Sequence, residues 1–328
     1  VRALFTGGYA GKRRFTWVLG GVLLLIVLLS CFTGYLLPWD QLSYWAITIS
    51  TGMLTYVPFV GSRLQEIVLG GPGISELTLG RFYTVHTTVA PVALLLLAAW
   101  HFWRVRRAGG VVYPQDDPPR EDEPDKVMFW PDLMIREIAQ GLAVVAVVVV
   151  LAAMFGAPLG EAANPGMSPN PAKAPWYFVG FQELLIHFHP VAAVLILPLL
   201  AGVGLLALPY LAPAEVPEGR WFLSASGRRS AGVAGVLALV LTPILVFWSE
   251  QTGMMADDLV LGAIVPLVKL AAWCWLLAWW ARRGAGPAEG VQAVVVFLLT
   301  SFVVMTVIGA WFRGPGMALV WPWSGGAS

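Results

Sequence analysis

Charged residues are scarce in this sequence. Asp, Glu, Lys and Arg make up 12% of its 328 residues, whereas 58% are hydrophobic, and the formal net charge is only +1. A soluble domain of this length would carry about twice that charged fraction, so the composition indicates an integral membrane protein. The near-neutral balance gives no support to nucleic-acid binding.

Cysteine and histidine are rare as well. The two cysteines, Cys31 and Cys274, both lie in apolar segments, and no Cys-x-x-Cys-His sequence for haem attachment is present, so a disulfide framework is not expected. There are only four histidines. The first residue is Val and no signal peptide is visible, which suggests that the chain begins inside a longer gene product.

Long apolar runs dominate instead. At about 20 residues per membrane crossing, seven spanning helices are predicted, at residues 15–37, 84–104, 140–159, 190–211, 231–249, 259–281 and 291–312. Of the 20 Lys and Arg residues, 15 are Arg104 or lie in the regions 1–14, 105–139, 212–230 and 282–290, which the positive-inside rule assigns to the cytoplasm. The sequence therefore predicts an all-α membrane bundle with a cytoplasmic N-terminus and an outer C-terminus. The long outer loops, 38–83 and 160–189, are expected to carry function.

The second predicted span carries a histidine near each end, His86 and His101. Fifteen residues separate them, which is about 22 Å along a helix and about 60° around its axis, and Pro91 between them is expected to kink the helix. This geometry suits two redox centres stacked across a bilayer, with imidazole as an axial ligand. Two interfacial histidines that hydrogen-bond to neighbouring helices are the other interpretation.

Gly20 and Gly34 in the first span favour the redox interpretation. They are 14 residues apart, which nearly matches the separation of the histidines. Glycine lets a flat, bulky group approach a helix closely, although small residues also serve ordinary helix packing in membranes.

Four stretches resemble the cytochrome b family, the quinone-handling membrane subunit of bacterial cytochrome bc-type complexes (quinol–cytochrome c oxidoreductases). "TGYLLPWDQLSYWA" (33–46) resembles the end of the family's third helix and its surface helix, and 57–86 resembles the segment leading into the fourth, histidine-bearing helix. "NPAKAPWYFVGFQELL" (170–185) resembles the quinol-site loop, and 308–323 resembles the C-terminal end of some bacterial members. All four occur in the family's order.

The resemblance implies two b-type haems. His86 would ligate the haem near the outer side and His101 the haem near the cytoplasmic side, with Gly34 and Gly20 packed against them respectively. Arg104 and Arg106, next to Arg107, could pair with haem propionates or quinone, or simply anchor the helix on the cytoplasmic side. The quinol-oxidising pocket would be lined by Phe32, Tyr35, Trp45, Ala46, Pro175, Trp176 and Tyr177.

The sequence departs from the family in two places that bear on this chemistry. The family's first two helices, which carry the partner histidines, have no counterpart here, so another chain or missing sequence is expected to supply the second ligand of each haem. The family often has Pro-Glu-Trp-Tyr in the quinol loop, whereas here Ala174 takes the place of the glutamate. Tyr177, Glu183, His187 or water must then accept protons. Glu183 is the favoured candidate if burial raises its pKa; a solvated helix-start glutamate is the alternative.

The third departure is in the C-terminal half. Five spans follow the histidine helix, where relatives commonly have three or four, and the segment 231–281 resembles nothing that we can place. Lys269 inside it could pair with a carboxylate, contact a lipid headgroup or snorkel. We expect a partial haem-binding domain at 1–110, a cytoplasmic linker at 111–139 and a C-terminal cytochrome b domain at 140–328.

The function implied by the resemblance is respiratory electron transfer in the bacterial inner membrane. Quinol would be oxidised on the outer side, with one electron passing to a Rieske-type iron–sulfur protein and then cytochrome c. The other electron would pass through the haems to quinone, coupled to proton translocation, in a homodimeric complex. The alternatives are a haem-free scaffold derived from cytochrome b and a transporter, although no internal repeat supports a transporter.

Overall fold

The computed structural model describes residues 2–113, 127–156, 159–211, 216–252, 258–284 and 286–323. Within these ranges the chain is helical, and its β-pairing consists of two isolated bridges, Asp40 with Ala162 and Arg313 with Leu319. The predicted all-α fold class is therefore confirmed. The helices are α1 (Arg2–Phe5), η1 (Gly11–Arg13), α2 (Arg14–Tyr35), α3 (Gln41–Gly52), η2 (Met53–Tyr56), α4 (Gly61–Leu69), α5 (Glu76–Thr84), η3 (Val85–Val89), α6 (Ala90–Arg107), η4 (Phe129–Leu133), α7 (Met134–Met154), α8 (Val179–His187), η5 (Val191–Ile196), α9 (Leu197–Leu211), α10 (Ala225–Thr252), η6 (Val260–Ile264), α11 (Val265–Gly284), α12 (Pro287–Trp311) and η7 (Pro315–Met317).

Seven helices of the described chain are long and apolar enough to cross a membrane, as predicted. They are Gly11–Tyr35, Glu76–Arg107, Phe129–Met154, Val191–Leu211, Ala225–Gln251, Val260–Gly284 and Pro287–Trp311. The third begins at Phe129, about three helical turns before its predicted start at 140. Its first turns carry Asp132, Arg136 and Glu137, and charged residues hide a helix start from a hydropathy pattern. The chain is a multi-pass membrane protein.

The chain divides into two compact units. One unit comprises Val1–Pro114 together with Ala162–Ser328, and the other is Gln115–Glu161, which contains α7. The predicted linker 111–139 includes residues 114–126, which lie outside the described residues. Every site discussed below belongs to the first unit.

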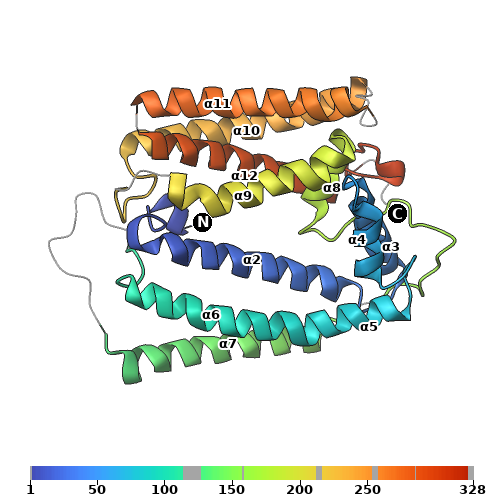
Figure 1. The fold of residues 1–328 in the computed structure, drawn as a ribbon, viewed down its shortest axis with the longest axis horizontal. Coiled ribbons are helices and arrows are strands. Elements are labelled where there is room, and N and C mark those ends of the chain that lie inside the picture. Colours follow the sequence, from blue (N-terminus) through green and yellow to red (C-terminus); the bar gives the residue numbers. More distant parts are fainter. Residues whose placement is uncertain are drawn as a thin grey trace. The chain divides into compact units, whose positions relative to one another are not determined.

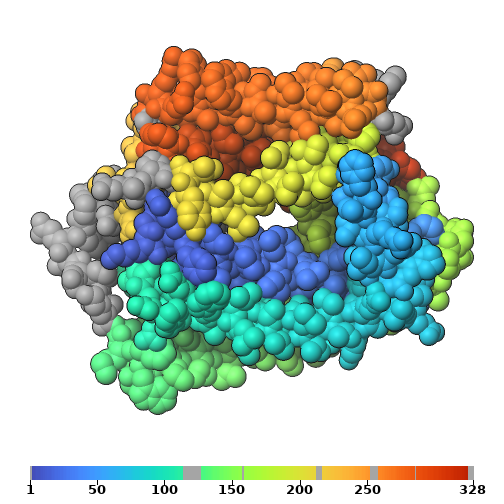
Figure 2. Space-filling view, in the orientation of Figure 1, coloured from blue at the N-terminus to red at the C-terminus, as the bar shows by residue number. Residues whose placement is uncertain are grey.

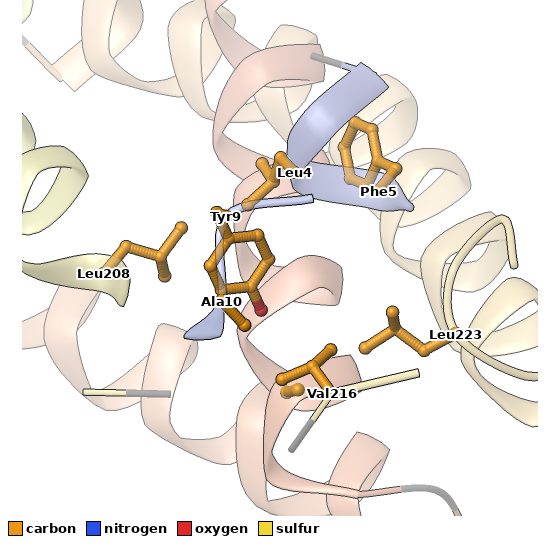
Figure 3. Packing of buried hydrophobic residues seen from close by; sticks show 8 residues of the cluster. Leu4, Phe5, Tyr9, Ala10, Leu208, Val216 and Leu223 are labelled. Carbon is orange, nitrogen blue, oxygen red and sulfur yellow. The ribbon is translucent and has the colours of Figure 1, made fainter. Parts of the chain in front are cut away.

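The N-terminal segment ties α2 to the C-terminal half of the first unit. Trp17 in α2 donates a hydrogen bond from Nε1 to the carbonyl oxygen of Leu205 in α9 at 2.6 Å. Gln292 of α12 donates to the carbonyl oxygen of Leu4 at 2.8 Å. The buried cluster around this junction, seen in Figure 3, consists of Leu4, Phe5, Tyr9, Ala10, Leu208, Val216, Leu223 and Ala288. These contacts hold one end of α2 against α9 and α12.

Helices α10, α11 and α12 lie together in the C-terminal half (Figure 1). Their shared core contains Ala234, Ala281 and Ala293, all buried. Small side chains let membrane helices approach closely without a large hydrophobic driving force. The segment 231–281, for which the sequence offered no family resemblance, thus packs as ordinary helices around α12. Lys269 is exposed on α11.

The surface helix α3 is held by a cap at its N-terminus and by the packing of a buried apolar residue. Asp40 caps it by accepting a hydrogen bond from the Ser43 amide at 2.9 Å, which satisfies one of the free N–H groups of a helix start. Its buried residue Ile47 packs with Leu36, just after α2, and with Phe82 of α5. The surface helix α3 is thereby packed against the end of α2 and against α5.

Candidate functional site

Each predicted histidine lies directly over one of the predicted glycines. A Cβ atom built on Gly34 would stand 2.5 Å from Cε1 of His86, and one on Gly20 would stand 3.3 Å from Cε1 of His101. Helices α2 and α6 run side by side (Figure 1), so the two imidazoles face the same neighbour at two levels. The sequence predicted that His86 and Gly34 would contact one haem and that His101 and Gly20 would contact the other, and in the structure each ring lies against the glycine of its own pair.

The helix that carries both histidines changes its hydrogen-bonding pattern at His86. Residues Val85–Val89 form a π-turn, in which the Ala90 amide donates to the carbonyl oxygen of Val85. Pro91 follows at once, and a proline inside an α-helix clashes with the carbonyl four residues earlier. The wider π-turn is a recognised way to interrupt the α-helical ladder at such a point. Pro91 was predicted to kink the helix, and the structure has its change in hydrogen bonding in the turn just before Pro91, which contains His86.

The hydrogen bonds of the imidazoles indicate which ring nitrogens are available to bind a metal. Nδ1 of His86 lies 2.9 Å from the carbonyl oxygen of Ser30. A carbonyl oxygen only accepts, so Nδ1 carries the proton and Nε2 keeps its lone pair. Metal-bound histidines usually have this arrangement, with one ring nitrogen held by a carbonyl and the other on the metal. Nδ1 of His101 is buried without a hydrogen-bond partner among the described residues, and a buried polar atom of this kind calls for an additional group.

The C-terminal end of the histidine helix is strongly basic. A cavity of about 380 Å³ is lined by Lys12, Arg104, Arg107 and Ala108. The Arg104 guanidinium also lies over the Phe15 ring, 5.2 Å from its centroid, while its Nε atom is buried and finds no hydrogen-bond partner in the part of the chain that the structure describes. Arg106 lies in the same helical turn. Clustered cations suit anionic groups such as carboxylates and phosphates.

The predicted quinol loop is held in place from two sides. On α8, the Gln182 amide accepts from the Ala174 backbone N–H at 2.8 Å and donates to the carbonyl oxygen of Ala172 at 2.6 Å. From the C-terminal segment, the Gly316 amide donates to Asn170 Oδ1 at 2.6 Å. The backbone of residues 170–174 is therefore fixed by side-chain hydrogen bonds rather than by regular secondary structure.

The structure brings some of the predicted pocket residues together and separates others. Burial raises the pKa of Tyr177, and the nearby Cys31 of α2 raises it further, so the loop lies near the C-terminal half of α2. Phe32 packs against Phe82, with 5.7 Å between their ring centroids, and Tyr35 ends α2. Trp176 is 74% exposed.

Trp45 and Ala46 lie on the surface helix instead. Trp45 Nε1 donates to the carbonyl oxygen of Asn164 at 3.0 Å, so α3 meets the start of the 160–189 loop. Pro175 begins the turn that leads into α8, since its carbonyl oxygen accepts from the amides of Phe178 and Val179.

Glu183 does not have the raised pKa that the sequence led us to expect. Burial raises its pKa, but hydrogen bonds and charge from His187 and Arg313 outweigh burial and lower it. Nε and Nη2 of Arg313 contact the two carboxylate oxygens at 2.9 and 2.8 Å, and both side chains are fully buried. The alternative of a solvated glutamate is also excluded, because the side chain has no exposed surface.

Arg313 gathers further polar groups that sequence reasoning missed. Its Nη1 donates to Glu250 of α10 and to the carbonyl oxygen of Met317, and its Nη2 lies 3.2 Å from Nε2 of His187. We call Glu183, His187, Glu250 and Arg313 the Arg313 cluster. The available signal in the sequence was Arg313 itself, which lies in a predicted outer region with few cations. A buried charge must be paired, so a buried Arg313 would have required carboxylate partners.

An opening separates α2 from α9 in the space-filling view. Figure 2 shows it between the blue surface of α2 and the yellow surface of α9, close to α8. It lies between the helix that carries Gly20 and Gly34 and the helices that follow the quinol loop.

The sequence of this chain is similar to known proteins over almost its whole length. Residues 1–165 match the family model described as Cytochrome b(N-terminal)/b6/petB. Cytochrome b of Rhodobacter capsulatus is 33% identical over 318 residues, which cover 94% of this chain and 62% of that protein. The chain belongs to the cytochrome b family.

Other members of the cytochrome b family match in the same way. Cytochrome b of Cereibacter sphaeroides is 27% identical over 286 residues, covering 84% of this chain and 58% of that protein. Cytochrome b6 of Oltmannsiellopsis viridis is 42% identical over 108 residues, covering 33% of this chain and half of that protein (50%). The chain thus spans about three fifths of the length of the two cytochrome b proteins that it matches.

The fold is shared with a solved structure. A chain of the structure titled "Hyperthermophilic respiratory Complex III" superposes with a TM-score of 0.57 at 22% identity, covering 94% of this chain and 73% of that one. The resemblance to cytochrome b predicted from the sequence is confirmed, and the paired histidines and glycines lie in the part of the chain that the family model matches.

Proposed function

We propose that this chain is the electron-transferring membrane subunit of a quinol–cytochrome c oxidoreductase, active only with its partner subunits. The observation that carries the proposal is the stacking of His86 over Gly34 and of His101 over Gly20 on one pair of helices. Two imidazoles at two levels of the membrane, each beside a position without a side chain, provide two places for a flat group.

The residues at these two places fit b-type haems. His86 Nε2 and one ring nitrogen of His101 would be axial ligands, and Arg104 and Arg106 would pair with propionates at the cytoplasmic end. When bound, the haems carry electrons between the two sides of the membrane. The chain has only four histidines, so the second ligand of each iron would come from helices of another chain or segment.

The glycines make the haem assignment testable in a graded way. Side-chain Cβ atoms essentially never approach another heavy atom within 3.0 Å, so Gly34→Ala must displace the His86 ring, whereas Gly20→Ala leaves an approach of 3.3 Å to His101. We expect Gly34→Ala to shift or abolish the absorption of the outer-side haem and Gly20→Ala to affect the other haem less. Reduced-minus-oxidised spectra of the purified complex measure both.

Gly80→Ala is the matched control for these variants. Gly80 lies on α5, in the same helical run as His86, and a Cβ there meets nothing within 4 Å. Loss of haem in Gly80→Ala as well would show that any alanine in this region disturbs the protein. It would contradict the interpretation that Gly34 and Gly20 matter because they lie next to the histidine rings.

The quinol-oxidising site is proposed at the outer ends of α2 and α8, beside loop 170–177. A partly buried phenol with a raised pKa stays protonated, so Tyr177 would donate a hydrogen bond to a quinol oxygen. Phe32, Tyr35, Pro175 and Trp176 would supply apolar walls, with Trp45 and Ala46 on the flanking surface helix. The opening between α2 and α9 gives a lipid-soluble quinol a route from the membrane (Figure 2).

The electron acceptors in this proposal lie on both sides of a bacterial inner membrane. A Rieske-type iron–sulfur protein would dock at the outer surface near residues 38–60 and 170–180 and pass one electron to cytochrome c. The second electron would leave through the haems to quinone on the cytoplasmic side, with proton translocation, in a dimeric complex. Glu183, which is paired with Arg313, would stay negatively charged beside the loop and would not accept protons.

A visible spectrum of the complex tests the proposal. We expect two b haems per copy of this chain by pyridine haemochrome assay, and reduction of both on addition of a quinol. A haem-free complex of normal composition would instead support the scaffold alternative, and peptide mapping of every subunit would show whether a chain with two further histidines is present.

A further inference from the structure

The Arg313 cluster has an unbalanced charge. Two carboxylates, Glu183 and Glu250, contact one guanidinium. With a neutral imidazole on His187 the sum is −1, and one added proton brings it to zero. Glu183 and Arg313 are fully buried, His187 is 9% exposed, and the Glu250 side chain is 28% exposed. Uncompensated charge is costly in such a site, so binding one proton would neutralise the remaining negative charge of the cluster.

His187 is positioned to hold that proton or to release it without rearrangement. Its Nε2 lies 3.2 Å from Nη2 of Arg313 and 3.4 Å from Oε2 of Glu183, and its Nδ1 lies 3.1 Å from Oγ of Ser249. A neutral ring accepts from Arg313 at Nε2 and donates from Nδ1 to Ser249. A charged ring donates from Nε2 to Glu183 instead. Both nitrogens keep a partner in either state.

The other central members of the cluster keep their charges. Hydrogen bonds and charge outweigh burial to lower the pKa of Glu183, and the same pairing outweighs burial to raise the pKa of Arg313. The charged and titratable groups that face His187 are Glu183 from α8, Glu250 from α10 and Arg313 from the segment after α12. Asp258, before η6, binds the amides of Val260 and Leu261 instead.

The cluster is attached to the quinol loop through its own elements. Glu183 follows Gln182, whose amide holds residues 172 and 174. Arg313 belongs to the segment that holds Asn170 through Gly316, and Lys173 lies 3.4 Å from the carbonyl oxygen of Ala310. On its other side the cluster reaches the surface through Glu250. It therefore connects the loop that lacks a carboxylate at Ala174 with the exterior.

We propose that the Arg313 cluster is a proton-exchange site, in which His187 takes protons released at loop 170–177 and Glu250 passes them to the outer aqueous phase. This inference rests on the proposed function. Oxidation of one quinol to quinone releases two electrons and two protons. The electrons go to the iron–sulfur protein and the haems. For each proton an O–H bond of the quinol breaks and an N–H bond forms at Nε2, which gives up that proton outward before the next arrives.

The pH dependence of quinol-driven haem reduction tests the proposal in membranes that contain the complete complex. In the wild type the rate should fall as the pH is lowered, because a charged His187 cannot accept a proton. His187→Gln should lower the rate at least tenfold at alkaline pH, as expected for loss of a general base, and should remove the pH dependence. An unchanged rate and slope in His187→Gln, with both haems present, would overturn the proposal.

His189→Gln is the matched control. His189 is two residues away and contacts Tyr56 and the Val191 amide. Among the described residues, these contacts do not include a hydrogen bond or ion pair to the Arg313 cluster. It should keep the wild-type rate and profile. If His189→Gln also flattens the profile, the effect belongs to this end of α8 in general and the assignment to His187 is wrong.

Glu250→Gln tests the charge argument if His187→Gln does not assemble. It removes one negative charge beside the ring, so the fall in rate should move to lower pH. A profile that does not move contradicts the charge argument.

A second readout does not depend on electron transfer. Infrared difference spectra of wild type recorded between two pH values should contain an imidazole band that His187→Gln lacks. If quinol reduces no haem in the wild type, the proposed function fails, and this band alone then decides the proton site: its presence supports the site and its absence overturns it.

Discussion

Replacement of His86 or His101 by alanine should each remove one b haem and leave the other in place. Alanine offers no ligand to iron, and the rings lie over different glycines, Gly34 and Gly20, 14 residues apart on α2. The two places are therefore independent, and the effects of the two substitutions should add. The measurement is haem per chain by pyridine haemochrome assay, which should fall from two to one in each variant and to none in the double variant.

His187→Ala and His189→Ala are the controls for this count. Both histidines lie at the end of α8 or just after it, away from the rings over α2, and both variants should keep two haems. The haem assignment is contradicted if His86→Ala and His101→Ala each retain two haems. Equal loss of both haems in either single variant would contradict the independence of the two places.

Arg313→Met should destabilise the protein by about 3–5 kcal/mol, which is typical when one partner of a buried ion pair is removed. Methionine fills much of the volume of arginine but leaves the carboxylate of Glu183, which has no exposed surface, without its two hydrogen bonds. Glu250 and the carbonyl oxygen of Met317 lose a donor as well. Thermal unfolding of the complex in detergent, followed by the haem absorption, measures the effect.

The double variant Arg313→Met with Glu183→Leu should recover part of that loss, because it removes the unpaired charge together with its partner. Arg63→Gln is the control: Arg63 also forms an ion pair on the predicted outer side, with Glu66 at 3.4 Å, but its side chain is 85% exposed. Such surface pairs contribute little, so this variant should unfold like the wild type. A double variant no more stable than Arg313→Met alone would contradict the role of the pair.

Features with a local pattern were predictable from the sequence. The seven spans follow from the length of the apolar runs. The pairing of His86 with Gly34 and of His101 with Gly20 follows from two similar spacings on two neighbouring helices. The resemblance to cytochrome b, carried by short stretches such as 170–185, is confirmed by the family match.

The Arg313 cluster could not be predicted in the same way. Glu183 and Arg313 are 130 positions apart, and no periodicity connects residues on α8 with a segment after α12. Without that partner, burial alone gave the wrong direction for the pKa of Glu183. The sign of a pKa shift depends on which charge the fold brings close, and only the three-dimensional structure contains that information.

The π-turn at Val85–Val89 makes the helix tolerant of a difference in length. One added residue in an α-helix normally rotates everything beyond it by about 100°, but a π-turn takes up an added residue within a single wider turn. The histidines are 15 residues apart and the glycines 14, yet each ring meets its own glycine. A homologue with one residue fewer between its histidines, and a regular α-helix at this point, would present both rings to the same two places. An insertion or deletion of one residue here therefore leaves the positions of both rings relative to the glycines unchanged. A search pattern with a strict spacing between the histidines would miss true relatives.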